Sequence, residues 1–242
     1  MKSLRFYCGT YNASSWAMRA WLSLKAADLI FEEIMVDIKR PQRFANLDHM
    51  ASLSPSATVP ALVVDGLTIF DSLAIMEFAN DTCEGRLLPV DLVKRAQARS
   101  LVAWQHAGLS SICARISFES AFYPYKRALT EGEQKDAERL CAAIEPILEK
   151  SGGPYLFGAA SLADHSLTPA AIRLLRHTPD LSRWPLSKSW METICADPLV
   201  DEWMRKADQL PHIWFDDYLI TGEKPALERD ELGAPLEYVL HT

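Results

Sequence analysis

Two dipeptides, Val59-Pro60 and Asp71-Ser72, have the residue types that could bind the end of a peptide. Proline has no N–H to donate to a sheet, so Pro60 at the start of an apolar run leaves the Val59 backbone without a continuing strand partner. Asp71-Ser72 opens a helical pattern, and the free N–H groups and positive dipole end of a helix N-terminus favour a carboxylate. Ser72 adds a hydroxyl donor to this site.

The hairpin between these dipeptides predicts that they lie side by side. Asp65-Gly66 is a strong signal for a two-residue turn, and such a turn fixes the register of the strands on either side. Val64 then pairs with Leu67, and counting back places Pro60 opposite Asp71.

A cis bond between Val59 and Pro60 would turn the Val59 N–H and C=O outward, where a peptide could add as a short strand. The carboxylate of that peptide would lie at Ser72. The alternative is that Pro60 only starts a strand and that Asp71-Ser72 only caps a helix.

The first 82 residues predict a small α/β domain that would position these groups. Strand patterns at 4–8 and 31–36 flank a helix over 14–28 whose apolar stripe contains Trp16, Ala20 and Leu24. A short helix is expected within 37–53, followed by the hairpin and a helix over 71–82. The first two strands should be parallel with a right-handed crossover, since a helix joins them.

Strand signals nearly vanish after residue 90, and the pattern becomes helical. One long helix is expected over 92–122, ended by Pro124, and further helices are expected over 131–153, 161–177, 185–197 and 198–210. Ser161 and Asp164 match a capping pattern at the start of the third of these helices. The chain therefore divides into a first domain (1–82), an all-helical domain (91–210) and a C-terminal tail (211–242).

Composition excludes several classes of function. The chain has 242 residues, 49% of them hydrophobic, and a net charge of −7, which argues against binding to nucleic acid or to an anionic membrane. No apolar run reaches the length of a membrane span. The five cysteines are scattered, and the histidines do not cluster, so we expect reduced thiols in a cytoplasmic protein, with neither a disulfide framework nor a metal site.

Three segments, "TVPALVVDG", "DSLAIMEF" and "SLADHSL", at these separations, resemble the cytosolic glutathione transferase superfamily. The resemblance covers residues 1 to about 210. It implies the glutathione transferase fold, in which an α/β thioredoxin-like N-terminal domain with a cis proline precedes an all-α C-terminal domain. It also implies that the Val59 backbone, next to Pro60, binds the cysteine backbone of glutathione. Asp71 and Ser72 would bind its γ-glutamyl end, and Asp164 would be a folding element.

The same resemblance implies a catalytic serine in the loop before the first helix. The thiolate is the reactive form of glutathione, and a hydroxyl donor at a helix N-terminus favours it. Ser14 is the first choice and Ser15 follows closely, with one of them serving as the N-cap. "NASSWAMR" is similar to the "SSxSxR" segment of the zeta class, which includes maleylacetoacetate isomerases, but the first serine of that pattern falls on Asn12. An Asn12 amide could also donate to sulfur.

Other residues of this region leave alternatives open. Tyr11 is a rival donor, or it lines the pocket for the second substrate. Cys8 could form a mixed disulfide with glutathione, although a buried, inert thiol is the simpler interpretation. Arg19, one turn into the helix, is expected to be exposed or paired with an acid, without a catalytic role.

The second substrate is expected between this edge of the sheet and the long helix predicted over 92–122. Phe118 and Phe122 suit a flat apolar electrophile, and Arg115 could receive a carboxylate on it. The alternative is that these side chains only pack helices or form dimer contacts.

The sequence therefore predicts a glutathione transferase that activates the thiolate of glutathione, its co-substrate, for attack on a small aromatic or unsaturated electrophile, as in detoxification. The alternatives are a glutathione-dependent isomerase or ether-cleaving enzyme of the same fold, or a non-catalytic binding protein. A homodimer is expected from the resemblance.

Overall fold

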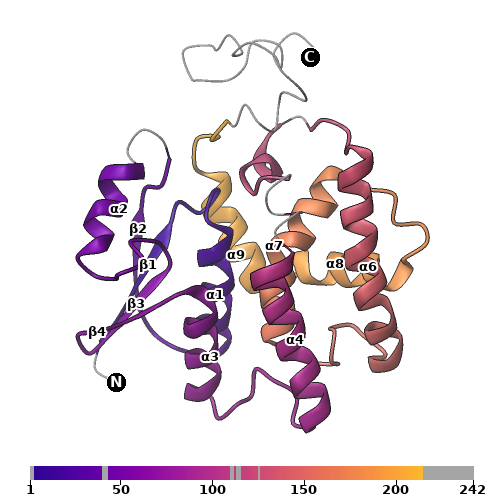
Figure 1. The fold of residues 1–242 in the computed structure, drawn as a ribbon, viewed down its shortest axis with the longest axis horizontal. Coiled ribbons are helices and arrows are strands. Elements are labelled where there is room, and N and C mark those ends of the chain that lie inside the picture. Colours follow the sequence, from indigo (N-terminus) through magenta and orange to yellow (C-terminus); the bar gives the residue numbers. More distant parts are fainter. Residues whose placement is uncertain (1–2, 40–42, 110–111, 113–115, 125, 215–242) are drawn as a thin grey trace.

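A four-stranded mixed sheet forms the centre of the N-terminal part of the chain (Figure 1). The computed structural model describes residues 3–39, 43–109, 112, 116–124 and 126–214. The strands are β1 (Leu4–Gly9), β2 (Glu32–Val36), β3 (Ala61–Val64) and β4 (Leu67–Phe70), in the spatial order β2-β1-β3-β4. β1 and β2 are parallel, whereas β3 pairs antiparallel with β1 and with β4. The predicted parallel pairing of the first two strands and the predicted hairpin of the last two are therefore confirmed.

The hairpin has the register that its turn residues dictate. Val64 pairs with Leu67 and Ala61 pairs with Phe70, so the next positions along the ladder are Pro60 and Asp71. Asp65 and Gly66 both have positive φ, 48° and 91°, as the favoured two-residue hairpin turn requires. The Val59–Pro60 bond is cis, as expected.

Helices cover both faces of the sheet. α1 (Ser15–Ala26) and α3 (Ser72–Thr82) lie on one face, and α2 (Arg43–Ala51) lies on the other (Figure 1). β1 shows how alternation serves both faces, because Phe6 and Cys8 pack with α1 and α3 whereas Tyr7 packs in the cluster that contains Met50 of α2.

The C-terminal part is helical. α4 (Leu92–Gly108) is followed by the 3₁₀ turn η1 (Glu119–Phe122) and then by α6 (Glu131–Ser151), α7 (Leu162–His177), α8 (Pro185–Cys195) and α9 (Pro198–Asp208). The single helix expected over 92–122 is wrong. α4 ends at Gly108, a poor helix former, and the Leu109 N–H caps it by donating to the Trp104 carbonyl. None of the described helices combines the length and the apolar character needed to cross a membrane.

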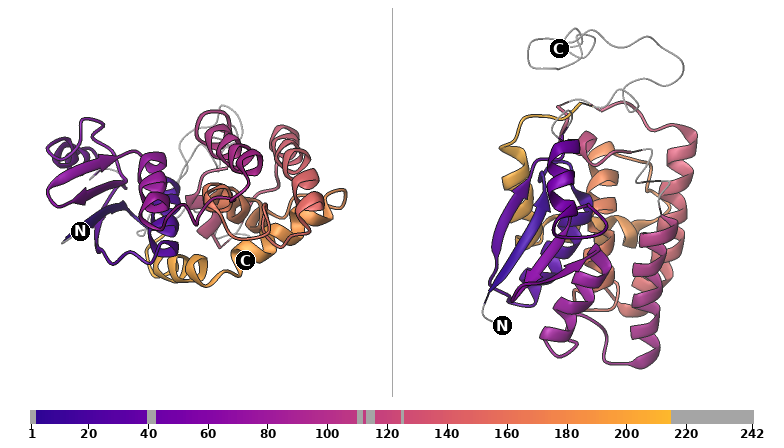
Figure 2. Two further views of the ribbon diagram at one scale, coloured as in Figure 1. Left: turned by 90° about the horizontal axis from the view of Figure 1, so that it is seen from below. Right: turned by 60° about the vertical axis from the view of Figure 1, so that its left-hand side comes forward.

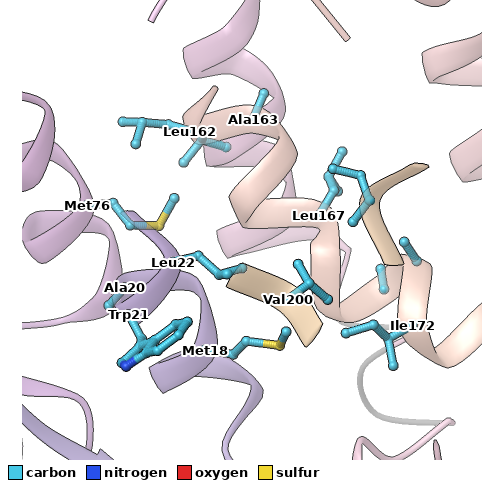
Figure 3. Packing of buried hydrophobic residues seen from close by; sticks show 14 of the residues in the cluster. Met18, Ala20, Trp21, Leu22, Met76, Leu162, Ala163, Leu167, Ile172 and Val200 are labelled. Carbon is cyan, nitrogen blue, oxygen red and sulfur yellow. The ribbon is translucent and has the colours of Figure 1, made fainter. Parts of the chain in front are cut away.

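α1 joins the two parts of the molecule. The views in Figure 2 place the sheet and the helical region side by side, with α1 and α3 between them. Figure 3 shows Leu22 of α1, Val200 of α9 and Leu167 of α7 as members of one buried apolar cluster. Helix α1 is therefore buried on almost every side, and the amphipathic pattern predicted for it is wrong in one respect. Trp16, expected in the apolar stripe, remains 38% exposed.

Asp164 connects the start of α7 to its surroundings. One carboxylate oxygen accepts from the Leu156 N–H (3.0 Å) and from Trp190 Nε1 (2.9 Å). The other accepts from the N–H and the hydroxyl of Ser161 (2.9 and 2.7 Å). The side chain is fully buried, so its loss would leave several donors without a partner in an apolar environment.

We predict that Asp164→Ala lowers the free energy of unfolding by about 3 kcal/mol, because buried donors lose their acceptor. Urea unfolding measures this loss. The matched control is Thr130→Ala, which removes the less buried capping box of α6 and should cost about 1 kcal/mol. Equal losses in the two variants would contradict a special role for Asp164.

Candidate functional site

The Val59-Pro60 edge offers unpaired backbone groups. Within the described part of the chain, neither the N–H nor the C=O of Val59 has a hydrogen-bond partner. β3 begins two residues later, and Val59 is half-buried. The edge can therefore accept an extended peptide through two main-chain hydrogen bonds.

The N-terminus of α3 lies beside this edge. Asp71 is its N-cap, and its Oδ1 accepts from the Leu73 N–H at 2.8 Å. The Asp71 φ of 73° is unusual for a residue other than glycine, and it follows from the abrupt change from strand to helix at this point. Oδ2 lies 3.5 Å from Nε2 of His106 on α4, so the helical region also contacts this carboxylate.

Ser72, the first residue of α3, keeps its polar groups available. Its side chain is only 4% exposed, and its hydroxyl forms no hydrogen bond with the described residues. The carboxylate of Asp71 and the hydroxyl of Ser72 can thus bind opposite charges on one small ligand, an ammonium at Asp71 and a carboxylate at Ser72.

Ser14 is the N-cap of α1. Its Oγ accepts from the Ala17 N–H at 3.3 Å, which satisfies one of the free donors of the helix. The backbone of Gly9 is very close, since a Cβ built there would lie 2.6 Å from the Ser14 Cβ. Ser14 therefore has a clear structural role at the point where β1 turns into α1.

Ser15 accepts a hydrogen bond from the helical part of the molecule. Its Oγ lies 3.2 Å from Nη2 of Arg173 on α7, and the guanidinium can only donate. Both Ser14 and Ser15 are at least 95% buried. Because both hydroxyl oxygens accept hydrogen bonds from the protein, each hydroxyl proton is left to donate to another acceptor.

Asn12 forms one hydrogen bond with the segment that follows α9. Its Nδ2 donates to the Pro211 carbonyl at 2.9 Å, and its Oδ1 is buried without a partner among the described residues. A little further on, the Ile213 carbonyl accepts from the Tyr123 hydroxyl at 2.7 Å. Residues 211–213 therefore connect the loop before α1 with the end of η1. Nδ2 retains a second N–H that a ligand could use.

Tyr11 contacts β2 and α9. Its hydroxyl donates to Glu33 Oε2 at 2.8 Å, and its ring packs edge-to-face on Trp203 of α9. Burial and the nearby Cys8 and Glu33 raise the pKa of the Tyr11 hydroxyl. Lys206 of α9 pairs with the same Glu33 carboxylate at 2.8 Å. The Tyr11 hydroxyl proton is thus used in the hydrogen bond to Glu33, and a role for Tyr11 in lining the substrate pocket stays a prediction.

Cys8 has the environment of an inert thiol. It is fully buried, and its Sγ donates to the Ile34 carbonyl. Burial raises the pKa of this thiol to about 12, which is the opposite of what a reactive cysteine needs. In the described ranges no group of His, Cys, Asp and Glu side chains could hold a metal ion.

The predicted second-substrate residues are only partly placed. Phe118 and Phe122 pack edge-to-face with ring centroids 5.4 Å apart, and Phe118 is 1% exposed. Arg115 lies outside the described residues. The two phenylalanines therefore form an apolar cluster at η1, and their contact with a substrate stays a prediction.

Sequence reasoning missed a polar stripe on α1, formed by Ser15, Arg19 and Ser23. Arg19 Nε donates to the Ser166 carbonyl at 2.8 Å, and Ser23 Oγ lies 3.1 Å from His165 Nδ1. Arg19 is 1% exposed, so the expectation that it is exposed is wrong, whereas its pairing with an acid stays a prediction. The signal was the i, i+4, i+8 spacing of the three polar residues, which places them on one face of a helix.

The partners of the stripe lie on α7. Ser15 contacts Arg173, and Ser23 contacts His165, so the two helices run antiparallel along the stripe. Each partner is at least 93% buried. Buried polar groups are costly unless they are paired, so these contacts select one register of α1 on α7.

We predict that acid weakens this interface through His165. Burial lowers the pKa of His165 from 6.5 to about 4, so the unfolded chain takes up a proton first as the pH falls below 6.5. The free energy of unfolding is therefore greatest above pH 6.5, and protonation of His165 alone should lower it by about 2 kcal/mol near pH 5.

Urea unfolding of the unmodified protein and of His165→Gln, at neutral pH and near pH 5, measures how much His165 contributes to this loss of stability. The variant should lose less stability on acidification than the unmodified chain. His49→Gln, which removes an exposed histidine on α2, is the control and should leave the pH dependence unchanged. An identical pH dependence in His165→Gln would refute the prediction.

The chain is similar to known proteins in both sequence and fold. Residues 13–82 match the family model described as "Glutathione S-transferase, N-terminal domain". The chain is 31% identical over 181 residues to the maleylacetoacetate isomerase of Mus musculus and 32% identical over 181 residues to that of Rattus norvegicus. Each match covers 72% of this chain and 79% of the relative. A glutathione transferase homologue from Burkholderia, solved with bound glutathione, has a TM-score of 0.63 at 25% identity, covering 86% of this chain and 100% of that one.

Proposed function

Because the chain belongs to the glutathione transferase superfamily, with glutathione as its co-substrate, we propose that the N-terminus of α1 activates the glutathione thiolate for attack on a small electrophile. The observation that carries this proposal is the pair of buried serines at the start of α1. Both accept hydrogen bonds from the protein and keep a proton to donate. A thiolate at this position would also be favoured by the helix dipole.

Glutathione would bind along the Val59 edge. The Val59 N–H and C=O would pair with the cysteine backbone of glutathione, next to Pro60. Asp71 would accept from the γ-glutamyl ammonium, and Ser72 would donate to the γ-glutamyl carboxylate. What supports this arrangement is the hairpin register and the unpaired groups of Val59 and Ser72.

Ser15 is the stronger thiolate donor of the two serines in this proposal. Ser14 is occupied as the N-cap and sits against Gly9, whereas the oxygen of Ser15 accepts from a guanidinium. A hydrogen bond from a charged donor polarises the hydroxyl, so its own proton becomes a better donor. Asn12 could contribute its second amide N–H.

The reaction itself has two candidate outcomes. In conjugation, the sulfur forms a thioether with the electrophile. In isomerisation, the thiolate adds to a conjugated C=C bond, rotation follows, and elimination restores the double bond and the free thiolate. The mouse and rat maleylacetoacetate isomerases favour isomerisation of an unsaturated acid as the second candidate. Glutathione is consumed only in conjugation, so its stoichiometry separates the two outcomes.

Three further properties belong to this proposal. The chain would act as a cytoplasmic homodimer in detoxification or in the catabolism of unsaturated acids. Its domains would span residues 1–82 and 91–210, with 211–242 as a tail. Phe118 and Phe122 would line the pocket for the electrophile. A thiol-disulfide role for Cys8 is disfavoured by its burial.

We predict that Ser14→Ala with Ser15→Ala lowers kcat/KM toward a generic aromatic electrophile roughly a hundredfold, because the thiolate loses its donors. Steady-state kinetics measures this loss. The single changes separate the two serines, since Ser15→Ala should lower kcat more and Ser14→Ala should lower stability more, by about 1 kcal/mol. Full activity in the double variant would reject a serine mechanism, and loss of that activity on Cys8→Ala would point to the thiol.

We also predict that Ser72→Ala raises the KM for glutathione about tenfold and leaves kcat nearly unchanged, because Ser72 binds the γ-glutamyl end rather than the sulfur. Initial rates at varied glutathione concentration test this. Ser100→Ala, which removes an exposed hydroxyl on α4, is the control. A fall in kcat with constant KM would contradict the assignment.

A further inference from the structure

A guanidinium is buried at the junction of the two parts of the molecule. Arg173 of α7 is 3% exposed, and its Nη2 lies 3.2 Å from Ser15 Oγ. Nη1 donates to the Pro169 carbonyl at 3.2 Å, and the guanidinium carbon lies 5.1 Å from the centre of the Phe118 ring. The backbone of its own helix and an aromatic face thus fix the guanidinium beside Ser15.

The direction of the Arg173–Ser15 hydrogen bond has a chemical consequence. Arginine has no acceptor atom, so Ser15 Oγ must be the acceptor in this contact. The Ser15 hydroxyl proton cannot point back at Arg173 and is directed toward another acceptor. The donor is a cation in a buried setting, where hydrogen bonds polarise one another more strongly than they do in water.

We propose that Arg173 is a positioning residue that acts through Ser15, orienting and polarising its hydroxyl so that bound glutathione is held as thiolate. This inference rests on the proposed function and deepens it. The helical region contributes the charge, and the N-terminal domain contributes the serine. Activation of the thiolate therefore depends on the register of α1 on α7.

The experiment titrates the thiolate of bound glutathione by its ultraviolet difference absorbance, without a second substrate. Arg173→Gln should raise the pKa of the bound thiol by about one unit, which corresponds to about tenfold less thiolate below that pKa. Arg173→Lys, which keeps a cation, should recover about half of this shift.

A double-mutant cycle with Ser15→Ala separates an effect through Ser15 from a direct one. In the Ser15→Ala background, neither change at Arg173 should shift the thiol pKa further. Arg19→Gln is the matched control, because it removes another buried guanidinium that hydrogen-bonds between α1 and α7. It should lower the melting temperature without moving the thiol pKa.

Each outcome decides the matter. An equal shift from Arg173→Gln with and without Ser15 overturns the proposal and assigns Arg173 a direct contact with sulfur or substrate. If Arg173→Gln lowers stability as Arg19→Gln does and leaves the thiol pKa unchanged, Arg173 is structural only. If Arg173→Gln does not fold, the shift in Arg173→Lys and its disappearance with Ser15→Ala give the same test. A protein that binds no glutathione thiolate at all would overturn the proposed function itself.

Discussion

The contact between α1 and α7 is the interaction on which the arrangement of the site depends. Its apolar part, which includes the buried Leu22 and Leu167, provides most of the buried area, but apolar contacts have little directional preference. The polar stripe of Ser15, Arg19 and Ser23 adds directional hydrogen bonds, because each member has a buried partner on α7. A shift of one turn would leave buried donors unpaired, so one register is strongly preferred.

Local signals made much of the Val59-Pro60 edge predictable from sequence. The Asp65-Gly66 turn fixed the hairpin register, and the register fixed the neighbours of Pro60. The capping pattern at Ser161 and Asp164 was equally local. These features depend on residues a few positions apart, where backbone geometry leaves few choices.

The features that sequence reasoning missed depend on distant segments. Arg173 and Ser15 are 158 positions apart, and Asn12 and Pro211 are 199 apart, so neither spacing nor periodicity brings them together. The end of α4 at Gly108 was missed for another reason, since one glycine in a helical pattern is often tolerated. Burial on almost all sides also hid the polar stripe, because α1 was read as a helix with one apolar face.

The position of α1 explains why the chemistry is expected at its N-terminus rather than elsewhere along the sheet edge. The helix dipole and the free N–H groups favour an anion at any exposed helix start, but water screens that effect at the surface. At the start of α1, Ser14 and Ser15 are buried between a sheet and a helical bundle, where the same groups act through a lower dielectric. In the proposed mechanism, the helical region buries α1 and places Arg173 beside Ser15, which would supply the environment in which a weak donor holds a thiolate.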